Sequence, residues 1–145
     1  MKISTRGRYA LKMLTDLALY QQDGYLNLNE IARRQQISKK YLEQIVAGLN
    51  RKQILKASRG PQGGYRLAKA PSEYRIGDIL RLTEGSILLA PWTEETGENQ
   101  INFEFWDGLN KAAASYADSL TLQDLAEAER KRDSASIPTT FKRAQ

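Results

Sequence analysis

The spacing of apolar side chains predicts a chain built mainly from α-helices. Over residues 4–22, Ala10, Leu14 and Leu17 follow one another at intervals of three or four positions, which is the spacing of one helix face. We expect this first helix to be closed by Gly24 in the left-handed conformation that ends many helices.

Two shorter helices are predicted next, at about 28–35 and 39–51. Asn27 and Ser38 stand just before them, where a side-chain oxygen can accept a hydrogen bond from a free backbone N–H. Two short helices joined by a turn of three or four residues are typical of a helix-turn-helix, although a hairpin within a helical bundle gives the same pattern. If Gln36 in this turn has a positive φ, that conformation costs on the order of 1 kcal/mol.

Residues 54–69 predict a β-hairpin directly after the third helix. Gly60 and Gly63 mark its turn. A hairpin in this place is the wing of a winged helix-turn-helix, so it favours that fold over a helical bundle. Arg59, at the tip, can enter a minor groove of DNA, where negative potential is concentrated; the alternative is a solvated strand end.

The second half of the chain is predicted to be helical as well. A helix at about 75–84 completes the winged unit, a long helix follows at about 102–119, and Thr121 caps a last helix. The expected fold is mainly α with a small β-hairpin: a winged helix-turn-helix plus a long C-terminal dimerisation helix. The expected boundaries are 1–85 for the DNA-binding domain, 86–101 for a loop, 102–132 for the dimerisation helices and 133–145 for a flexible tail.

The long helix carries large apolar side chains at intervals of three or four residues. Such a stripe suits the seam between two subunits, and packing on the chain's own winged domain is the alternative. The predicted seam consists of Phe103, Trp106, Leu109, Ala113, Tyr116 and Leu120.

The charges are divided unevenly along the chain. Residues 1–75 carry 15 basic and 5 acidic side chains, a net charge of +10, whereas residues 76–145 carry 7 basic and 12 acidic side chains, a net charge of −5. A basic first half that faces a polyanion explains this division, although lysines and arginines that merely solvate helix faces produce it too.

The composition excludes several kinds of site. The 145 residues include no cysteine and no histidine, which excludes disulfides, thiolate and imidazole metal ligands, and Ser-His-Asp or Cys-His active sites. We therefore expect no metal, no cofactor and no enzymatic activity. No apolar run approaches the roughly 20 residues that cross a bilayer, and we expect no signal peptide, so we expect a cytoplasmic protein without a membrane partner.

Three stretches, in a fixed order, carry a family resemblance. They are MKISTRGRYAL at 1–11, ISKKYLEQ at 37–44 and RGPQGGYRL at 59–67, followed by GDI at 77–79 and EG at 84–85. Together they resemble the Rrf-two family of bacterial winged-helix transcription regulators. The resemblance covers residues 1–85 strongly and the remaining helices in layout only.

The resemblance implies a homodimer that binds an imperfect inverted repeat in double-stranded promoter DNA, and we expect a repressor. It also implies that the long helix crosses its twofold mate. In the family, the loop before that helix holds three cysteines that ligate an iron–sulfur cluster, and this chain has none. It therefore looks more like the cluster-free, CymR-like branch, whose members answer to metabolic status through an effector metabolite or, in one case, a partner enzyme of cysteine synthesis.

The predicted DNA contacts lie on three elements. Ser38, Tyr41 and Glu43 match family positions near DNA, and we expect Glu43 to accept a hydrogen bond from a cytosine amino group and so to specify sequence. Ser38 is equally a helix cap, and Gln44 either contacts adenine or is solvated. The full predicted set is Thr5, Arg8 and Tyr9 on the first helix, Ser38, Lys39, Lys40, Tyr41, Glu43, Gln44 and Arg51 around the recognition helix, and Lys56, Arg59, Gly60 and Gly63 on the wing.

Two further alternatives remain open at this stage. The first concerns the whole protein, which could instead be a protein-interaction module that docks a metabolic enzyme and no longer binds DNA. The second concerns Trp92 and Trp106, which either line a switch site for an effector or belong to the core or the dimer seam.

Overall fold

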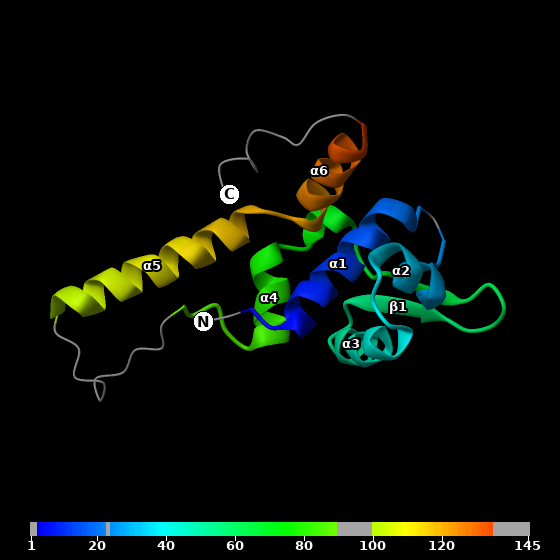
Figure 1. Ribbon diagram of the computed structural model, residues 1–145, viewed down its shortest axis with the longest axis horizontal. Helices are drawn as coiled ribbons and strands as arrows, with labels where there is room; N and C mark the ends of the chain where they lie inside the picture. Colours follow the sequence, from blue (N-terminus) through cyan, green and yellow to red (C-terminus); the bar gives the residue numbers. More distant parts are fainter. Residues whose placement is uncertain (1–2, 23, 90–99, 135–145) are drawn as a thin grey trace.

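A computed structural model describes residues 3–22, 24–89 and 100–134 (Figure 1). The described residues form six α-helices, one two-stranded antiparallel sheet and a short 3-10 helix. The fold expected from the sequence, mainly α with a small β-hairpin, is confirmed. The elements are α1 (Thr5–Tyr20), α2 (Leu28–Gln35), α3 (Lys39–Arg51), β1 (Leu55–Ser58), β2 (Gly64–Leu67), the 3-10 helix η1 (Pro71–Glu73), α4 (Ile76–Glu84), α5 (Gln100–Ser119) and α6 (Leu122–Ser134).

Side-chain caps fix where α2, α3 and α6 begin. The Ser38 Oγ accepts a hydrogen bond from the Tyr41 N–H at 3.2 Å, which starts α3 where the sequence predicts. At α6 the cap is reciprocal, because the Asp124 N–H donates to the Thr121 Oγ1 at 3.2 Å while the Thr121 N–H donates to the Asp124 Oδ2 at 2.8 Å. Asn27 caps α2 by accepting from the Asn29 N–H at 2.8 Å.

The end of α1 differs from the prediction. The helix stops at Tyr20, and the left-handed residue is Gln22 with φ 42°, so the prediction that Gly24 adopts this conformation is wrong. The Gly24 N–H instead donates to the Gln21 carbonyl at 2.8 Å and closes a turn. The chain therefore reverses two residues earlier than the glycine indicated.

The wing is a hairpin tied to the rest of the fold by a third extended segment. Leu55 pairs with Leu67, and Ser58 pairs with Gly64. Leu26 adds two backbone hydrogen bonds to Tyr65, of 2.8 and 2.9 Å, at the edge of the sheet. A side chain at Gly64 would collide with the Leu26 backbone, so glycine is required by this close approach.

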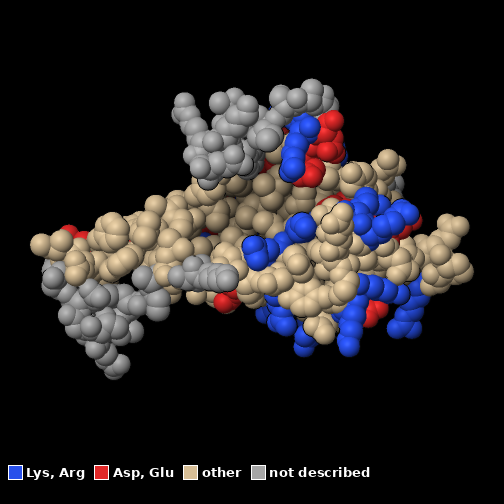
Figure 2. Space-filling model, in the orientation of Figure 1, with Lys and Arg blue, Asp and Glu red and all other residues tan. Residues whose placement is uncertain are grey.

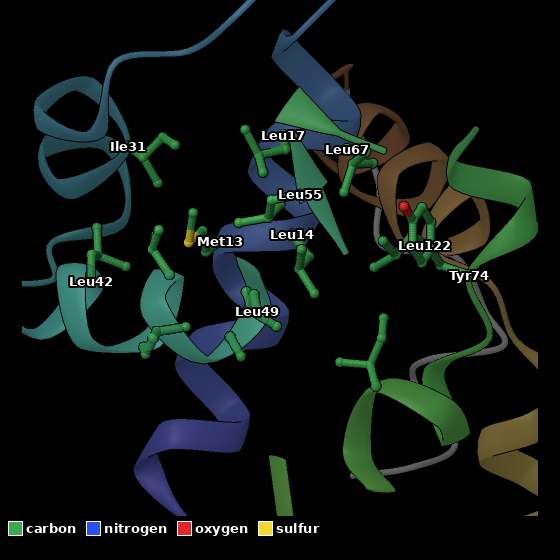
Figure 3. Close-up of a cluster of buried hydrophobic side chains, with 14 of the residues drawn as sticks. Met13, Leu14, Leu17, Ile31, Leu42, Leu49, Leu55, Leu67, Tyr74 and Leu122 are labelled. Atoms are coloured by element: carbon green, nitrogen blue, oxygen red, sulfur yellow. The ribbon is translucent and has the colours of Figure 1, made fainter. Parts of the chain in front are cut away.

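The hydrophobic core is built around α1. Met13, Leu14 and Leu17 are completely buried, and Figure 3 shows them surrounded by side chains from the other elements. Burying each such side chain contributes about 1.5–3 kcal/mol, so this cluster contributes strongly to the stability of the winged unit. The surrounding side chains are Ile31 of α2, Leu42 and Leu49 of α3, Leu55 and Leu67 of the strands, Tyr74, and Leu122 of α6.

The last two helices have different relations to this core. In Figure 1, α5 projects from the body as a long arm, whereas α6 folds back and packs against α1. A short antiparallel bridge joins Arg75 to Thr121: the Ile76 N–H donates to the Leu120 carbonyl at 2.9 Å, and the Leu122 N–H donates to the Tyr74 carbonyl at 3.0 Å. The first turns of α6 therefore belong structurally to the winged unit, and the division between residues 1–85 and 102–132 remains a prediction.

Candidate nucleic-acid interface

A buried ion pair sets the position of α2 against α1. Asp16 of α1 is completely buried, and Arg34 of α2 donates to both of its oxygens, at 2.7 and 3.0 Å. Gln35 adds a third hydrogen bond, with its Nε2 2.8 Å from the Asp16 Oδ2. The hydrogen bonds from Arg34 to Asp16 raise the pKa of Arg34 above its ordinary value. The centroid of the Tyr20 ring also lies 4.6 Å from the Arg34 guanidinium carbon.

The turn between α2 and α3 has the strained residue that the sequence allowed. Gln36 has φ 54° and ψ 44°, a left-handed conformation that a residue other than glycine adopts at a cost of about 1 kcal/mol. The Ile37 N–H donates to the Ala32 carbonyl at 3.1 Å across the turn. Together with the Asp16–Arg34 pair, this turn presents α3 to solvent in one orientation.

An aromatic contact holds α3 against α1. The rings of Tyr9 and Tyr41 meet edge to face, with their centroids 5.5 Å apart and an interplanar angle of 87°. The Lys12 ammonium lies 5.7 Å from the Tyr9 ring centroid. The two tyrosines that the sequence assigned to DNA contact are thus half-buried and fix the angle between the two helices.

The predicted DNA contacts of α1 and α3 share one exposed surface. Figure 2 shows lysine and arginine side chains gathered along the edge of the winged body where α3 lies, whereas the visible face of the α5 arm carries few. Side chains that are exposed on this surface are accessible to a ligand. The exposed members are Thr5, Arg8, Ser38, Lys39, Lys40, Glu43, Gln44 and Arg51, and Tyr9 and Tyr41 are half-buried.

The wing places its predicted contacts beside this surface. Lys56, Arg59 and Gly60 are exposed, and Gly60 has φ 102°, which favours glycine. At Gly63, a side chain would collide with the backbone of Ser58 and the residues after it. Glycines 60 and 63 therefore shape the turn, and Arg59 stands on it.

A carboxylate ties the start of α1 to the end of α4. Both the N–H and the hydroxyl of Ser4 donate to the Glu84 Oε1, at 3.1 and 2.6 Å, while the Ser4 Oγ accepts from the Gly7 N–H at 3.1 Å. A methyl group on Gly7 would overlap the Glu84 carboxylate. The MKISTRGRYAL and EG stretches thus meet in one contact, which holds Thr5 and Arg8 on the surface described above.

A second ion pair joins the winged unit to the arm. Arg81 of α4 donates to both oxygens of Asp118 of α5, each at 2.8 Å, and Arg75 donates to the Asp118 carbonyl at 2.7 Å. The hydrogen bonds from Arg81 lower the pKa of Asp118 and raise that of Arg81. Gly77 lies under this pair, because any side chain there would overlap the Asp118 carboxylate.

The predicted seam residues of α5 lie on two different faces. Phe103, Trp106 and Ala113 are half-buried, whereas Leu109 and Tyr116 are exposed. Leu120 lies after the helix and packs against the core. The outward face also carries Ile101, 78% exposed, and Phe105, 61% exposed, which the predicted stripe did not include. The seam itself remains a prediction.

The predicted switch site can be described only in part. Trp106 stacks edge to face on Phe105 with ring centroids 5.0 Å apart. Trp92 and the acidic loop before α5 lie outside the described residues.

Comparison with known proteins decides the family. A family model described as an iron-dependent transcriptional regulator, Rrf2, matches residues 3–128. The chain belongs to the Rrf2 family. This Rrf2 protein is a transcriptional regulator, and the resemblance read from its motifs is confirmed.

Several relatives of this Rrf2 regulator are similar over nearly their whole length. It is 39% identical to the HTH-type transcriptional regulator CymR of Bacillus subtilis over 126 residues, which cover 87% of this chain and 90% of that protein. The solved structure of CymR, the global cysteine regulator of B. subtilis, matches with a TM-score of 0.81 and 38% identity, over 88% of this chain and 97% of that one. The structure of T. potens IscR matches with a TM-score of 0.76 and 31% identity, over 97% and 96% of the two chains.

The chain has no thiolate or imidazole ligand for the iron named in the family description. The sequence contains no cysteine and no histidine, so it does not fit a cluster held by thiolates or imidazoles. Among residues 3–22, 24–89 and 100–134, no group of three or more aspartates or glutamates is arranged to hold a metal ion. Within the same part of the chain, no helix is both long and apolar enough to cross a membrane.

Proposed function

We propose that this Rrf2 regulator is a homodimeric repressor that binds an imperfect palindrome in promoter DNA. The observation that carries the proposal is the joint surface of α1, α3 and the wing, on which the cations stand exposed around a capped recognition helix. In this arrangement α3 enters the major groove with its N-terminal residues at the base edges, and Arg59 enters the adjacent minor groove. Because its target is the chromosome, the regulator works in the cytoplasm.

Dimerisation is supported by the apolar face of the arm. Ile101, Phe105, Leu109 and Tyr116 expose large side chains on one side of α5. A second copy of the same helix is the partner that covers them, since a crossing pair of arms makes the same contacts from both sides. The two winged units of the dimer then bind two half-sites. Once the first unit is bound, binding of the second becomes intramolecular, which raises the overall affinity.

We further propose that the regulator works without an iron–sulfur cluster and responds to sulfur or cysteine status. The absence of cysteine supports the first part. The second part rests on the similarity to CymR, which is named as a global cysteine regulator. The signal itself is an effector metabolite or a partner enzyme that alters the angle between the two winged units.

A mobility-shift titration with the DNA upstream of the protein's own gene tests this function. We expect sequence-specific binding that weakens steeply with salt, because several phosphates are neutralised. Lys39→Gln should weaken binding to every duplex alike, whereas Glu43→Ala should change which sequence is preferred, by about 1–3 kcal/mol at its base pair.

The matched control is Lys69→Gln, an exposed lysine beyond the predicted contacts, which should behave like the unmodified protein. If the protein shifts no duplex even in dilute buffer, the proposed function is wrong and the protein-interaction alternative gains support.

A further inference from the structure

A hollow of about 460 Å³ lies where α3, α1 and α4 meet. The second half of α3 forms one wall with Gln44, Gly48, Arg51 and Lys52, the first turn of α1 contributes Arg6, and the end of α4 closes the hollow with Leu82 and Thr83. It continues the exposed surface of α3 described above, since Gln44 and Arg51 belong to both.

Three cations line this hollow without acidic partners. Arg6, Arg51 and Lys52 are exposed, and none of them forms an ion pair with an acidic residue of the described parts of the chain. The Arg51 Nε donates to the Ala47 carbonyl at 3.2 Å, which steadies its stem and leaves the rest of the guanidinium for a ligand. The hollow is thus complementary to an anion.

Gly48, which lines the hollow, is not required by the packing of the described chain. Gly48 lies in the interior of α3, where glycine weakens a helix relative to alanine. No atom of another element lies within 4 Å of the position that a Cβ would occupy, so alanine would fit the free protein without a clash. The bare backbone therefore leaves room for something from outside.

We propose that this hollow seats one phosphodiester of the bound DNA strand, and that Gly48 admits the sugar-phosphate backbone close to α3. This inference rests on the proposed function. DNA is favoured over a small free anion because the hollow is continuous with the predicted contacts of α3. Its three cations suit the phosphate, and the exposed side chain of Leu82 suits the apolar face of a deoxyribose. A phosphate held here fixes how deeply α3 enters the groove, and it carries no sequence information.

Fluorescence anisotropy with a labelled mixed-sequence duplex of roughly 30 base pairs tests the proposal in the full-length protein. Gly48→Ala should raise the melting temperature by on the order of 3 °C and still weaken duplex binding by about tenfold. Lys52→Gln should make the slope of log affinity against log salt shallower by about one for each winged unit, because each winged unit loses one phosphate contact.

Two control variants distinguish loss of the phosphate contact from a general change in helix stability or in net charge. Asn50→Ala exchanges a weaker helix former for alanine in the same helix outside the hollow, so it should raise the melting temperature without weakening binding. Lys69→Gln removes a cation elsewhere and should leave the salt slope unchanged.

The outcomes distinguish this inference from the proposed function. If the unmodified protein binds the duplex and both Gly48→Ala and Lys52→Gln bind it equally well, the phosphate seat is refuted and the regulator remains. If inorganic phosphate or a nucleoside monophosphate binds the unmodified protein and Gly48→Ala abolishes that binding while DNA affinity is unchanged, the hollow is a small-anion site instead. If the unmodified protein binds no duplex, the proposed function fails first.

Discussion

At the scale of single residues, the buried carboxylate of Asp16 has the clearest consequence for stability. Asp16 is completely buried, yet Arg34 remains about a quarter exposed, so the pair lies at the edge of the core. Removing the charge leaves the guanidinium without its bidentate acceptor. Asp16 directly precedes Leu17 of the apolar stripe, but helical spacing does not say which residue of another helix will contact it.

We expect Asp16→Asn to lower the free energy of unfolding by about 2 kcal/mol, because two charge-assisted hydrogen bonds are weakened at a buried site. Urea unfolding followed by circular dichroism measures this. The control is Glu30→Gln, which removes a surface partner of the same arginine, 3.8 Å away, and should cost no more than about 0.5 kcal/mol. Equal stability of the two variants would show that the Asp16 pair does not hold the helices together.

Single residues also show how far local sequence signals reach. The caps Ser38 and Thr121 act through neighbours three residues away, and both were predicted correctly. Gly24 was assigned the left-handed turn that Gln22 adopts, because glycine is the usual occupant and the preference does not fix the position. The contact of Ser4 with Glu84 joins residues 80 positions apart in the sequence, and no local pattern predicts it.

At the scale of elements, α5 shows why apolar spacing predicted a helix but mixed its faces. Intervals of three and four residues describe both the inward row, with Phe103 and Trp106, and the outward row, with Ile101 and Phe105. Packing against α4 covers one side of α5 and leaves the other side exposed. The sequence therefore predicted the helix and its apolar character, but not which side chains remain available to a partner.

We expect Phe105→Asp to weaken the proposed dimer by about thirtyfold or more, since a large exposed aromatic at the centre of an apolar face is a typical hot spot. Sedimentation equilibrium measures the dissociation constant. Lys111→Gln, an exposed residue of α5 that pairs with Asp107 in the same helix, serves as the control and should not change it. A Phe105→Asp protein that remains fully dimeric would contradict the assignment of this face.

At the scale of the whole molecule, two ionisable groups set limits on the pH range of stability. Arg81 lowers the pKa of Asp118 in the folded chain, so this carboxylate stabilises the fold above its unfolded pKa of about 3.9, and that contribution is lost as the pH falls through the lower folded value. Burial raises the pKa of Tyr74, whose hydroxyl donates to the Ile54 carbonyl at 3.0 Å. Its contribution is present below about pH 10 and is lost as the pH rises through the folded value.

We therefore expect the stability of the protein to fall on both sides of a plateau, below about pH 4 and above about pH 10. Asp118→Asn should flatten part of the acid limb, and Tyr74→Phe should flatten part of the alkaline limb. Thermal unfolding across the pH range measures both. A variant whose pH profile follows that of the unmodified protein would show that the substituted group does not contribute to that limb.

The return of α6 to the core has a genetic consequence. Leu122 is completely buried beside Tyr74 and the residues of α1, although it follows the arm in the chain. A nonsense mutation within α5 would remove Leu122 and the rest of α6. The apolar surface of the winged unit beneath α6 would then be exposed, and the shortened polypeptide would be a target for proteases. Such an allele would resemble a complete deletion, rather than yield a lone winged unit that still occupies DNA and interferes with the intact regulator.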